Sequence, residues 1–232
     1  MATIASKLDE VSGRIARACD AAGRPVSSVT LLAVSKTFSA DAVREALSAG
    51  QARFGENYVQ EALDKMAALA ASRAQLEWHL IGPLQSNKTR VVAESFDWVH
   101  SVDRLKIAQR LSDQRPAHLP ALQVCLQVNI SGEASKSGLA PAEVQTVARA
   151  VAALPRLTLR GLMAVPEPAG DLAAQRRPHR ALRDLLASLN AGGLALDTLS
   201  MGMTADLEAA VLEGATMVRV GTAIFGGRPA VA

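Results

Sequence analysis

Short runs of apolar residues alternate eight times with segments of helical periodicity along this chain. The first run, residues 29–34, is almost continuously apolar, as expected for a strand that is buried on both faces. We expect strands at residues 29–34, 52–55, 76–81, 98–100, 122–130, 157–163, 198–201 and 217–220. We expect helices at residues 39–49, 58–72, 86–93, 141–152, 172–190 and 205–213, and others that begin near 102 and 222.

This alternation predicts a parallel eight-stranded β/α barrel of the TIM type. A doubly wound open sheet is the alternative, but no Gly-x-Gly-x-x-Gly motif follows the first strand. An additional amphipathic helix is expected before the barrel at residues 3–22, with Leu8, Val11 and Ile15 on its apolar face. The chain has 232 residues and no internal repeat or linker, so we expect a single α/β domain over residues 1–232.

Composition argues against several classes of function. The chain has 25 Lys and Arg against 22 Asp and Glu, and a net charge of +3 is too small to indicate a nucleic-acid or membrane-surface partner. With 4 Phe, 2 Trp and 1 Tyr, few rings are available to stack on bases. No uncharged run approaches the ~20 residues of a membrane span. The first residues contain no apolar signal core, so we expect a cytoplasmic protein.

Cysteine and histidine spacing gives no metal or dithiol signature. Cys19 and Cys125 lie far apart and form no Cys-x-x-Cys pair, so we expect both to be small buried residues. The histidines do not show metal-ligand spacing, and no metal site is expected.

Lys36 directly follows the first strand, where a barrel opens onto its functional face. A surface lysine with a solvated amine is the ordinary alternative. At the mouth of a barrel, however, apolar walls favour the neutral amine, which can form a Schiff base with a carbonyl compound. We therefore expect Lys36 to be the reactive amine of the protein.

Two glycine and hydroxyl segments follow the last two strands. Residues 200–204 include Ser200 and Gly202, and residues 221–226 begin with Gly221 and Thr222. Backbone N–H groups and hydroxyls at such positions bind phosphate, and phosphate sites recur after strands seven and eight of this fold. Turn glycines and helix caps would explain either segment alone. Together they predict a phosphate-binding site.

Arg219 and Asn57 are further candidates. Arg219 shares a strand face with Met217 and Gly221, so we expect a buried cation that pairs either with a carboxylate such as Glu56 or with a ligand. Asn57 and Glu56 end the second strand, where they could bond the ligand or cap the next helix.

Three other residues complete the set of candidates. Met163 ends the sixth strand and is expected to wall the pocket. His79 is expected to be a packed strand residue, and Lys136 is either a second amine near the mouth or a solvated loop charge. A reactive lysine opposite a phosphate site fits a phosphorylated aldehyde. Pyridoxal 5′-phosphate (PLP) is the first candidate, and a phosphosugar bound by a lysine aldolase is the second.

The chain resembles the pyridoxal phosphate homeostasis protein family, the YggS/PROSC-type group related to the barrel of bacterial alanine racemase. Six motifs carry the resemblance, at residues 33–36, 54–61, 79–88, 135–138, 199–203 and 219–226. They occur in the same order as in the family and cover nearly the whole chain.

The resemblance implies a role for each candidate. It implies that Lys36 holds PLP as an internal aldimine and that Arg219 faces the pyridine nitrogen. It places Asn57 near the polar edge of the ring and matches Lys136 to a second lysine of the family, a candidate for cofactor handling. It assigns the phosphate to the two glycine and hydroxyl segments, through Ser200, Gly202, Gly221 and Thr222.

The expected function is to bind PLP and to buffer it or deliver it to enzymes that lack their cofactor, with any catalysis weak. Arginine cannot accept a proton, so Arg219 would hold the ring nitrogen neutral and make the cofactor a poor electron sink. A PLP-dependent amino-acid racemase is the alternative. In related racemases a tyrosine from a second domain and the partner subunit supplies a second acid–base group. This chain has only Tyr58, expected at the start of a helix. We expect a monomer without catalytic residues.

Overall fold

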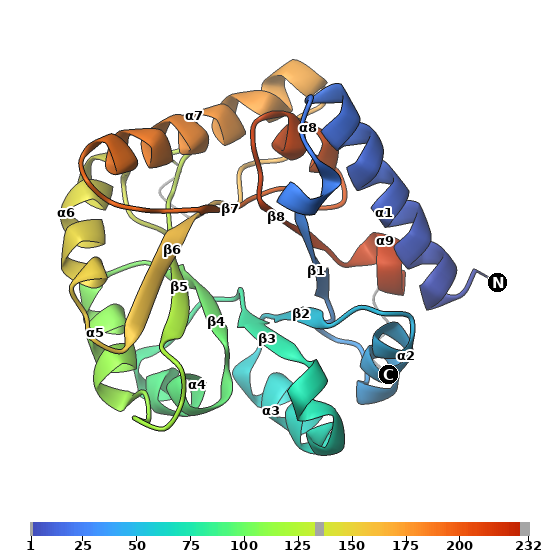
Figure 1. Cartoon of the computed structure of the whole chain (residues 1–232), viewed down its shortest axis with the longest axis horizontal. Helices are drawn as coiled ribbons and strands as arrows, with labels where there is room; N and C mark the ends of the chain where they lie inside the picture. The colour runs from blue at the N-terminus through green and yellow to red at the C-terminus, as the bar shows by residue number, and fades with distance from the viewer. Residues whose placement is uncertain (1, 133–136, 228–232) are drawn as a thin grey trace.

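The apolar runs form parallel strands that close into a barrel in the order β1 to β8, and β8 pairs with β1 (Figure 1). The computed structural model describes residues 2–132 and 137–227. The strands are β1 (Thr30–Val34), β2 (Arg53–Glu56), β3 (Glu77–Leu80), β4 (Trp98–Val102), β5 (Leu122–Gln127), β6 (Leu157–Met163), β7 (Thr198–Ser200) and β8 (Met217–Val220). The predicted β/α barrel is confirmed. In the closing pair, Thr30 lies opposite Met217 and Ala33 lies opposite Val220.

Helices surround the barrel in the order that the sequence predicts (Figure 1). They are α1 (Ile4–Ala21), α2 (Ala40–Ser48), α3 (Val59–Ala68), α4 (Thr89–Ser95), α5 (Leu105–Gln114), α6 (Pro141–Ala152), α7 (Leu172–Ala191), α8 (Leu207–Leu212) and α9 (Thr222–Phe225). The additional N-terminal helix is confirmed as α1, which packs against α2, α8 and α9. It buries Leu8, Val11 and Ile15 along one face, which agrees with their spacing in the sequence.

Element ends differ from the prediction at several boundaries, among them the ends of β5 and α3 and the start of α4 at Thr89 rather than at residue 86. Strand β5 ends at Gln127 rather than at residue 130, and beyond it Val128 and Asn129 pair with Leu139. Helix α3 ends at Ala68 rather than near residue 72, and a 3₁₀ turn at Ala70–Gln75 leads into β3. The apolar pattern continues through both boundaries, so it does not reveal where the backbone changes its hydrogen-bond partners.

Side chains of alternate strand residues fill the barrel. One apolar cluster contains Leu32, Trp98, Cys125, Met163 and Met217, which come from five different strands. Both cysteines are fully buried free thiols, as predicted. Burial raises the pKa of the Cys125 thiol to about 12, so it remains protonated near neutral pH. The barrel is therefore a packed core, and the strand ends and loops are left to form a site.

Candidate functional site

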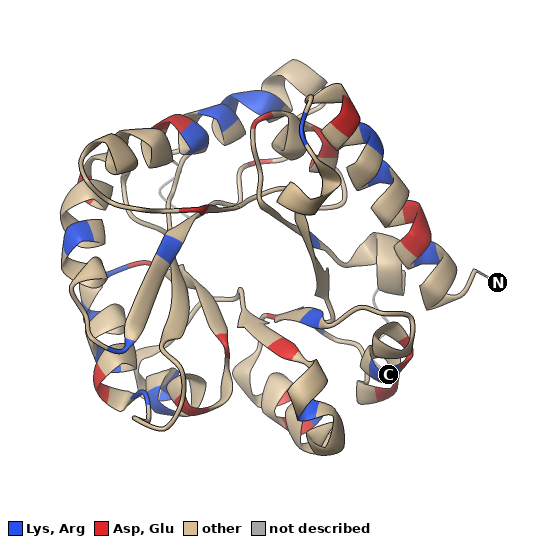
Figure 2. Ribbon diagram, viewed as in Figure 1, with Lys and Arg blue, Asp and Glu red and all other residues tan. Residues whose placement is uncertain are grey.

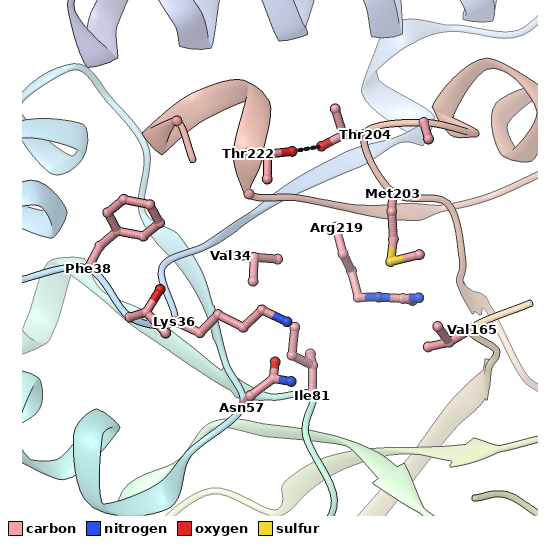
Figure 3. Close-up of a pocket in the computed structure, with 14 residues that line it drawn as sticks. Val34, Lys36, Phe38, Asn57, Ile81, Val165, Met203, Thr204, Arg219 and Thr222 are labelled. Atoms are coloured by element: carbon pink, nitrogen blue, oxygen red, sulfur yellow. Dashed lines mark hydrogen bonds between the residues drawn. The ribbon is translucent and has the colours of Figure 1, made fainter. Parts of the chain in front are cut away.

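The carboxyl ends of the strands surround a cavity of about 370 Å³ (Figure 3). Its lining includes five of the predicted residues, namely Lys36, Asn57, Arg219, Gly221 and Thr222. They come from the ends of β1, β2 and β8, which are widely separated in the sequence and adjacent in the closed barrel. Apolar side chains form much of the remaining wall, among them Val34, Phe38, Ile81, Val165 and Met203.

Lys36 extends from the turn after β1 into this cavity (Figure 3). Its side chain is half-buried and lies beside Val34 and Ile81, so its stem is in contact with the apolar wall. The next residue, Thr37, has a φ of 68°, which is uncommon for a residue other than glycine. Its N–H donates a hydrogen bond to Glu61 Oε1 at 2.5 Å. This bond holds the turn that aims Lys36 into the cavity.

A buried ionic cluster of Lys65, Glu56 and Glu61 connects that turn to α3. Lys65 on α3 donates from Nζ to the Ser35 carbonyl oxygen at 2.7 Å, to Glu56 Oε1 at 2.7 Å and to Glu61 Oε1 at 2.5 Å. Ser35 Oγ donates to the same Glu56 oxygen at 2.6 Å. Burial raises the pKa of the Glu56 carboxyl, and the Lys65 ammonium opposes that rise. The cluster ties together β1, β2 and α3.

Sequence reasoning missed Lys65. The one available signal was its spacing of four residues from Glu61 on the same helix. The contact with Glu56 depends on how α3 packs on β2, which the sequence pattern does not specify. Glu56 therefore has Lys65 and Ser35 as its partners, and neither caps α3 nor pairs with Arg219.

Arg219 lies inside the barrel, as predicted, and is only 4% exposed. Its Nη1 donates to Ser200 Oγ at 2.8 Å, and its Nη2 donates to the Ala164 carbonyl oxygen at 2.8 Å. Burial lowers the pKa of the guanidinium to about 10, so Arg219 is still a cation near neutral pH. The side chain reaches the cavity from β8 and ends near Met203 and Val165 (Figure 3).

Three predicted residues lie beneath the cavity and are not part of its lining. Ser200 is fully buried, and its hydroxyl contacts Arg219 and His100. Gly202 has a φ of +90°, and an added Cβ would lie 2.4 Å from the Ala210 Cβ, so this position requires glycine. The expectation that Met163 walls the pocket is not met, because strand alternation directs it into the barrel core at 1% exposure.

Two threonines form the edge of the cavity between the β7–α8 loop and α9. Thr222 Oγ1 donates to Thr204 Oγ1 at 3.2 Å (Figure 3). Gly221 precedes them, and a Cβ there would lie 3.1 Å from the Val34 carbonyl oxygen. The glycine thus lets the end of β8 lie close against the end of β1. Met203 donates its N–H to Asp206 Oδ1 at 2.7 Å, which shapes the loop that carries Thr204.

Asn57 contributes an acceptor without a protein partner. Its Oδ1 is buried and makes no hydrogen bond to any residue that the structure describes. The amide group lies near the end of the Lys36 side chain (Figure 3). Gly82 packs on the Asn57 backbone so closely that a Cβ would lie 2.2 Å from its carbonyl oxygen. A buried acceptor of this kind is normally satisfied by a ligand or by water.

A second hollow of about 320 Å³ adjoins the first and shares Asn57, Ile81 and Val165 with it. It continues toward Gln127 at the end of β5 and Ser137 in the loop that follows. The predicted amine Lys136 belongs to this loop and lies outside the described residues.

Among the helices that the structure describes, none is long and apolar enough to cross a bilayer.

Comparisons with known proteins agree on one family. Residues 7–229 match the family described as alanine racemase, N-terminal domain. A pyridoxal phosphate homeostasis protein of Pseudomonas aeruginosa is 63% identical over 228 residues, which are 98% of this chain and 97% of that protein. The protein of the same name from Escherichia coli K12 is 54% identical and covers 98% of each chain.

Solved structures show the same similarity. PipY of Synechococcus elongatus PCC7942 is 39% identical, and 97% of this chain is matched to all of PipY. The TM-score is 0.87 for PipY without PLP and 0.84 for PipY with PLP bound. Alanine racemase of Clostridium difficile 630 shares the fold at 14% identity and a TM-score of 0.69, and the match covers 56% of the racemase.

Proposed function

This chain belongs to the pyridoxal phosphate homeostasis protein family, and from that premise we propose that it binds PLP at Lys36 and buffers or delivers it without robust catalysis. One observation carries the proposal: the Lys36 amine, the Arg219 guanidinium and the Thr222 hydroxyl face one cavity of about 370 Å³. These groups match the aldehyde, the pyridine nitrogen and the phosphate of PLP. The PLP-bound structure of PipY supports the assignment.

Bound PLP would supply an electrophilic aldehyde and an electron-withdrawing ring, and a primary amine is the group that would hold such an aldehyde. Lys36 Nζ is the amine that the cavity offers for this bond. The turn at Thr37 and the Lys65 cluster beneath it keep the amine pointed inward. The unpartnered Asn57 Oδ1 lies beside this position and would accept a hydrogen bond from the polar edge of the ring.

The phosphate would bind at the edge formed by Gly221, Thr222 and Thr204. The two threonine hydroxyls can each donate to a phosphate oxygen, and the chain turns at Gly221 to expose backbone N–H groups. Gly202 would contribute by allowing the loop to turn. Ser200 would act through Arg219, since its hydroxyl already contacts Arg219 and His100 beneath the cavity.

Arg219 limits what the bound ring could do. A guanidinium donates hydrogen bonds and accepts none, so a pyridine nitrogen that faces it remains unprotonated. An unprotonated ring withdraws electrons weakly, whereas enzymes that use PLP as an electron sink often place a carboxylate at this nitrogen. The pocket therefore favours storage of the cofactor over chemistry on amino acids.

The racemase alternative requires a second acid–base group. Among the described residues that line the cavity, only Lys36 and Arg219 have ionisable side chains. Tyr58 is 54% exposed at the start of α3 and is not one of the lining residues. This composition of the cavity wall supports a PLP binder. Exchange of the α-hydrogen of an amino acid distinguishes such a binder from a racemase.

The proposal includes a cytoplasmic monomer that transfers PLP to apo enzymes. Two free cysteines are usual in a reducing compartment. Large apolar side chains exposed among the described residues are scattered over separate elements, at Val26, Tyr58, Val165 and Leu172. Such isolated residues do not form the apolar patch of a stable dimer. Light scattering during size-exclusion chromatography tests the monomer.

The function is tested by titrating the apo protein with PLP and then following exchange of the α-hydrogen of L-alanine in heavy water. We expect a new absorbance band that saturates at one PLP per chain, and exchange far below the ~1–1,000 per second that is typical of enzyme turnover. Exchange at enzymatic rates would establish the racemase alternative. Absence of a saturable band would contradict the binding proposal.

A further inference from the structure

A continuous row of polar side chains crosses the inside of the barrel and ends at Arg219. We call Glu77, His79, His100 and Ser200 the interior relay. The contacts are Glu77 Oε1 to His79 Nε2 at 2.8 Å, His79 Nδ1 to His100 Nε2 at 2.9 Å, and His100 Nδ1 to Ser200 Oγ at 2.7 Å. Arg219 Nη1 completes the row by donating to Ser200 Oγ at 2.8 Å.

The relay joins the two mouths of the barrel. Glu77 begins β3 and lines a hollow at the amino ends of the strands, where its side chain is 38% exposed. His79, His100 and Ser200 are each 0% exposed, so the middle of the relay is isolated from water. His79 also stacks on Trp98, with ring centroids 5.3 Å apart, which fixes the plane of its ring. The sequence predicts His79 only as a packed strand residue.

The Glu77 carboxylate sets the direction of the hydrogen bonds when both histidines are neutral. It can only accept, so His79 carries its proton on Nε2 and accepts at Nδ1. His100 then donates from Nε2 to His79 and accepts at Nδ1 from the Ser200 hydroxyl. Arginine can only donate, so a lone pair of the same Ser200 oxygen accepts from Arg219 Nη1.

Both histidines are neutral in this arrangement. A proton added to His79 Nδ1 would face the His100 Nε2–H, and a proton added to His100 Nδ1 would face the Ser200 O–H and deprive that hydroxyl of its acceptor. Burial lowers the pKa of both imidazoles, and the nearby Arg219 cation adds to that effect at His100. Bulk water does not reach these groups at 0% exposure, so an error at any link would leave a buried polar group without its partner.

We propose that the interior relay positions Arg219, so that a carboxylate at one mouth of the barrel fixes which guanidinium N–H groups face a ligand at the other. Ser200 takes one Nη1–H and the Ala164 carbonyl takes one Nη2–H, which leaves the remaining donors for the cavity. None of the four relay residues is among the residues that line the cavity. The part of the proposal that concerns the ring of PLP rests on the proposed function.

The relay can be tested in the protein without PLP. Histidine labelled with ¹⁵N gives a distinct pair of ring nitrogen signals for each tautomer. We expect His79 and His100 to be neutral and protonated on Nε2 at neutral pH. A proton on Nδ1 of either ring, or a doubly protonated ring, would overturn the relay.

A matched pair of serine variants tests the link to Arg219. Ser200→Ala removes the hydroxyl between His100 and Arg219, so the His100 Nδ1 signal should move to that of an unbonded nitrogen. Ser101→Ala is the control. Ser101 lies on β4 and is buried like Ser200, but its hydroxyl has no partner among the described residues. An unchanged His100 signal in Ser200→Ala would contradict the assignment.

Ligand binding then shows whether the relay acts on the ring or on the phosphate. Ser200→Ala should weaken PLP and unphosphorylated pyridoxal by the same factor, roughly two- to tenfold, because both present the same ring to Arg219. A loss confined to PLP would mean that Ser200 holds the phosphate, which overturns the positioning role. Failure of the unmodified protein to bind PLP would instead contradict the proposed function, and the apo histidine signals would still decide whether the relay exists.

Discussion

Arg219 enters the cavity as a buried cation whose remaining N–H groups can only donate. At the scale of single residues, this side chain is the one from which the proposed carrier function predicts a poor electron sink. Lys36 supplies an amine that either kind of protein would need. Neutral carbonyl and hydroxyl oxygens, rather than a carboxylate, hold the Arg219 guanidinium in place.

Replacing Arg219 by a carboxylate should change the properties of the bound ring. In Arg219→Glu the ring nitrogen gains a group that stabilises its proton, so the absorbance of bound PLP should become pH-dependent. Exchange of the α-hydrogen of L-alanine should also rise above that of the unmodified protein. Arg219→Gln is the control, since it removes the cation without adding a carboxylate. Identical spectra for a folded, PLP-loaded Arg219→Glu and the unmodified protein would show that Arg219 does not face the nitrogen.

The threonine pair should discriminate PLP from pyridoxal. Hydrogen bonds to a charged group contribute about 1.5–3 kcal/mol each. Thr204→Ala combined with Thr222→Ala should therefore weaken PLP by well over tenfold and leave pyridoxal nearly unchanged, as measured by titration of the apo protein. Equal losses for the two ligands would place the phosphate elsewhere.

At the scale of elements, Lys65 connects α3 to the turn that carries Lys36. Lys65→Met should leave the Glu56 carboxylate buried without a cation, at a cost of about 3–5 kcal/mol in the free energy of unfolding. Adding Glu56→Gln should restore part of that loss, because the buried charge is then gone. Urea denaturation of both single variants and the double variant measures the coupling. Additive losses would mean that the two side chains act independently.

The sequence predicts these elements well where burial and alternation determine them. Residues 29–34 are almost continuously apolar, and β1 is buried from Leu32 to Val34. Arg219 is placed inward by its spacing from Met217. Contacts that depend on how elements pack were not predictable. His100 and Ser200 are 100 residues apart, and they meet only because the strands close into a barrel.

Figure 2 shows Lys and Arg interspersed with Asp and Glu over the ribbon, in keeping with the small net charge of the chain. At the scale of the whole molecule, the most distinctive electrostatic feature is therefore internal. The barrel encloses a row of neutral histidines between a carboxylate and a guanidinium. This arrangement couples protonation of the interior to folding.

Stability should fall as the pH falls below about 6.5. Because burial lowers the pKa of His79 and His100 from the ordinary 6.5, the unfolded chain binds protons there that the folded chain does not. The free energy of unfolding should then decrease by at most about 1.4 kcal/mol per pH unit for each histidine. Urea denaturation from pH 7.5 to 5.5 measures how the free energy of unfolding changes with pH. The difference in that slope between His100→Asn and the unmodified protein gives the contribution of His100. A steeper slope in His100→Asn would contradict the assignment.

Mapping the amine that binds the cofactor tests the central claim most directly. The protein loaded with PLP is reduced with borohydride and digested, and the modified lysine is identified by mass spectrometry. Lys36→Met should abolish the modification, and the control Lys106→Ala, at an exposed position on α5, should leave it unchanged. We predict one phosphopyridoxyl group, on Lys36. A phosphopyridoxyl group found only on another lysine would contradict the assignment of this cavity as the PLP site.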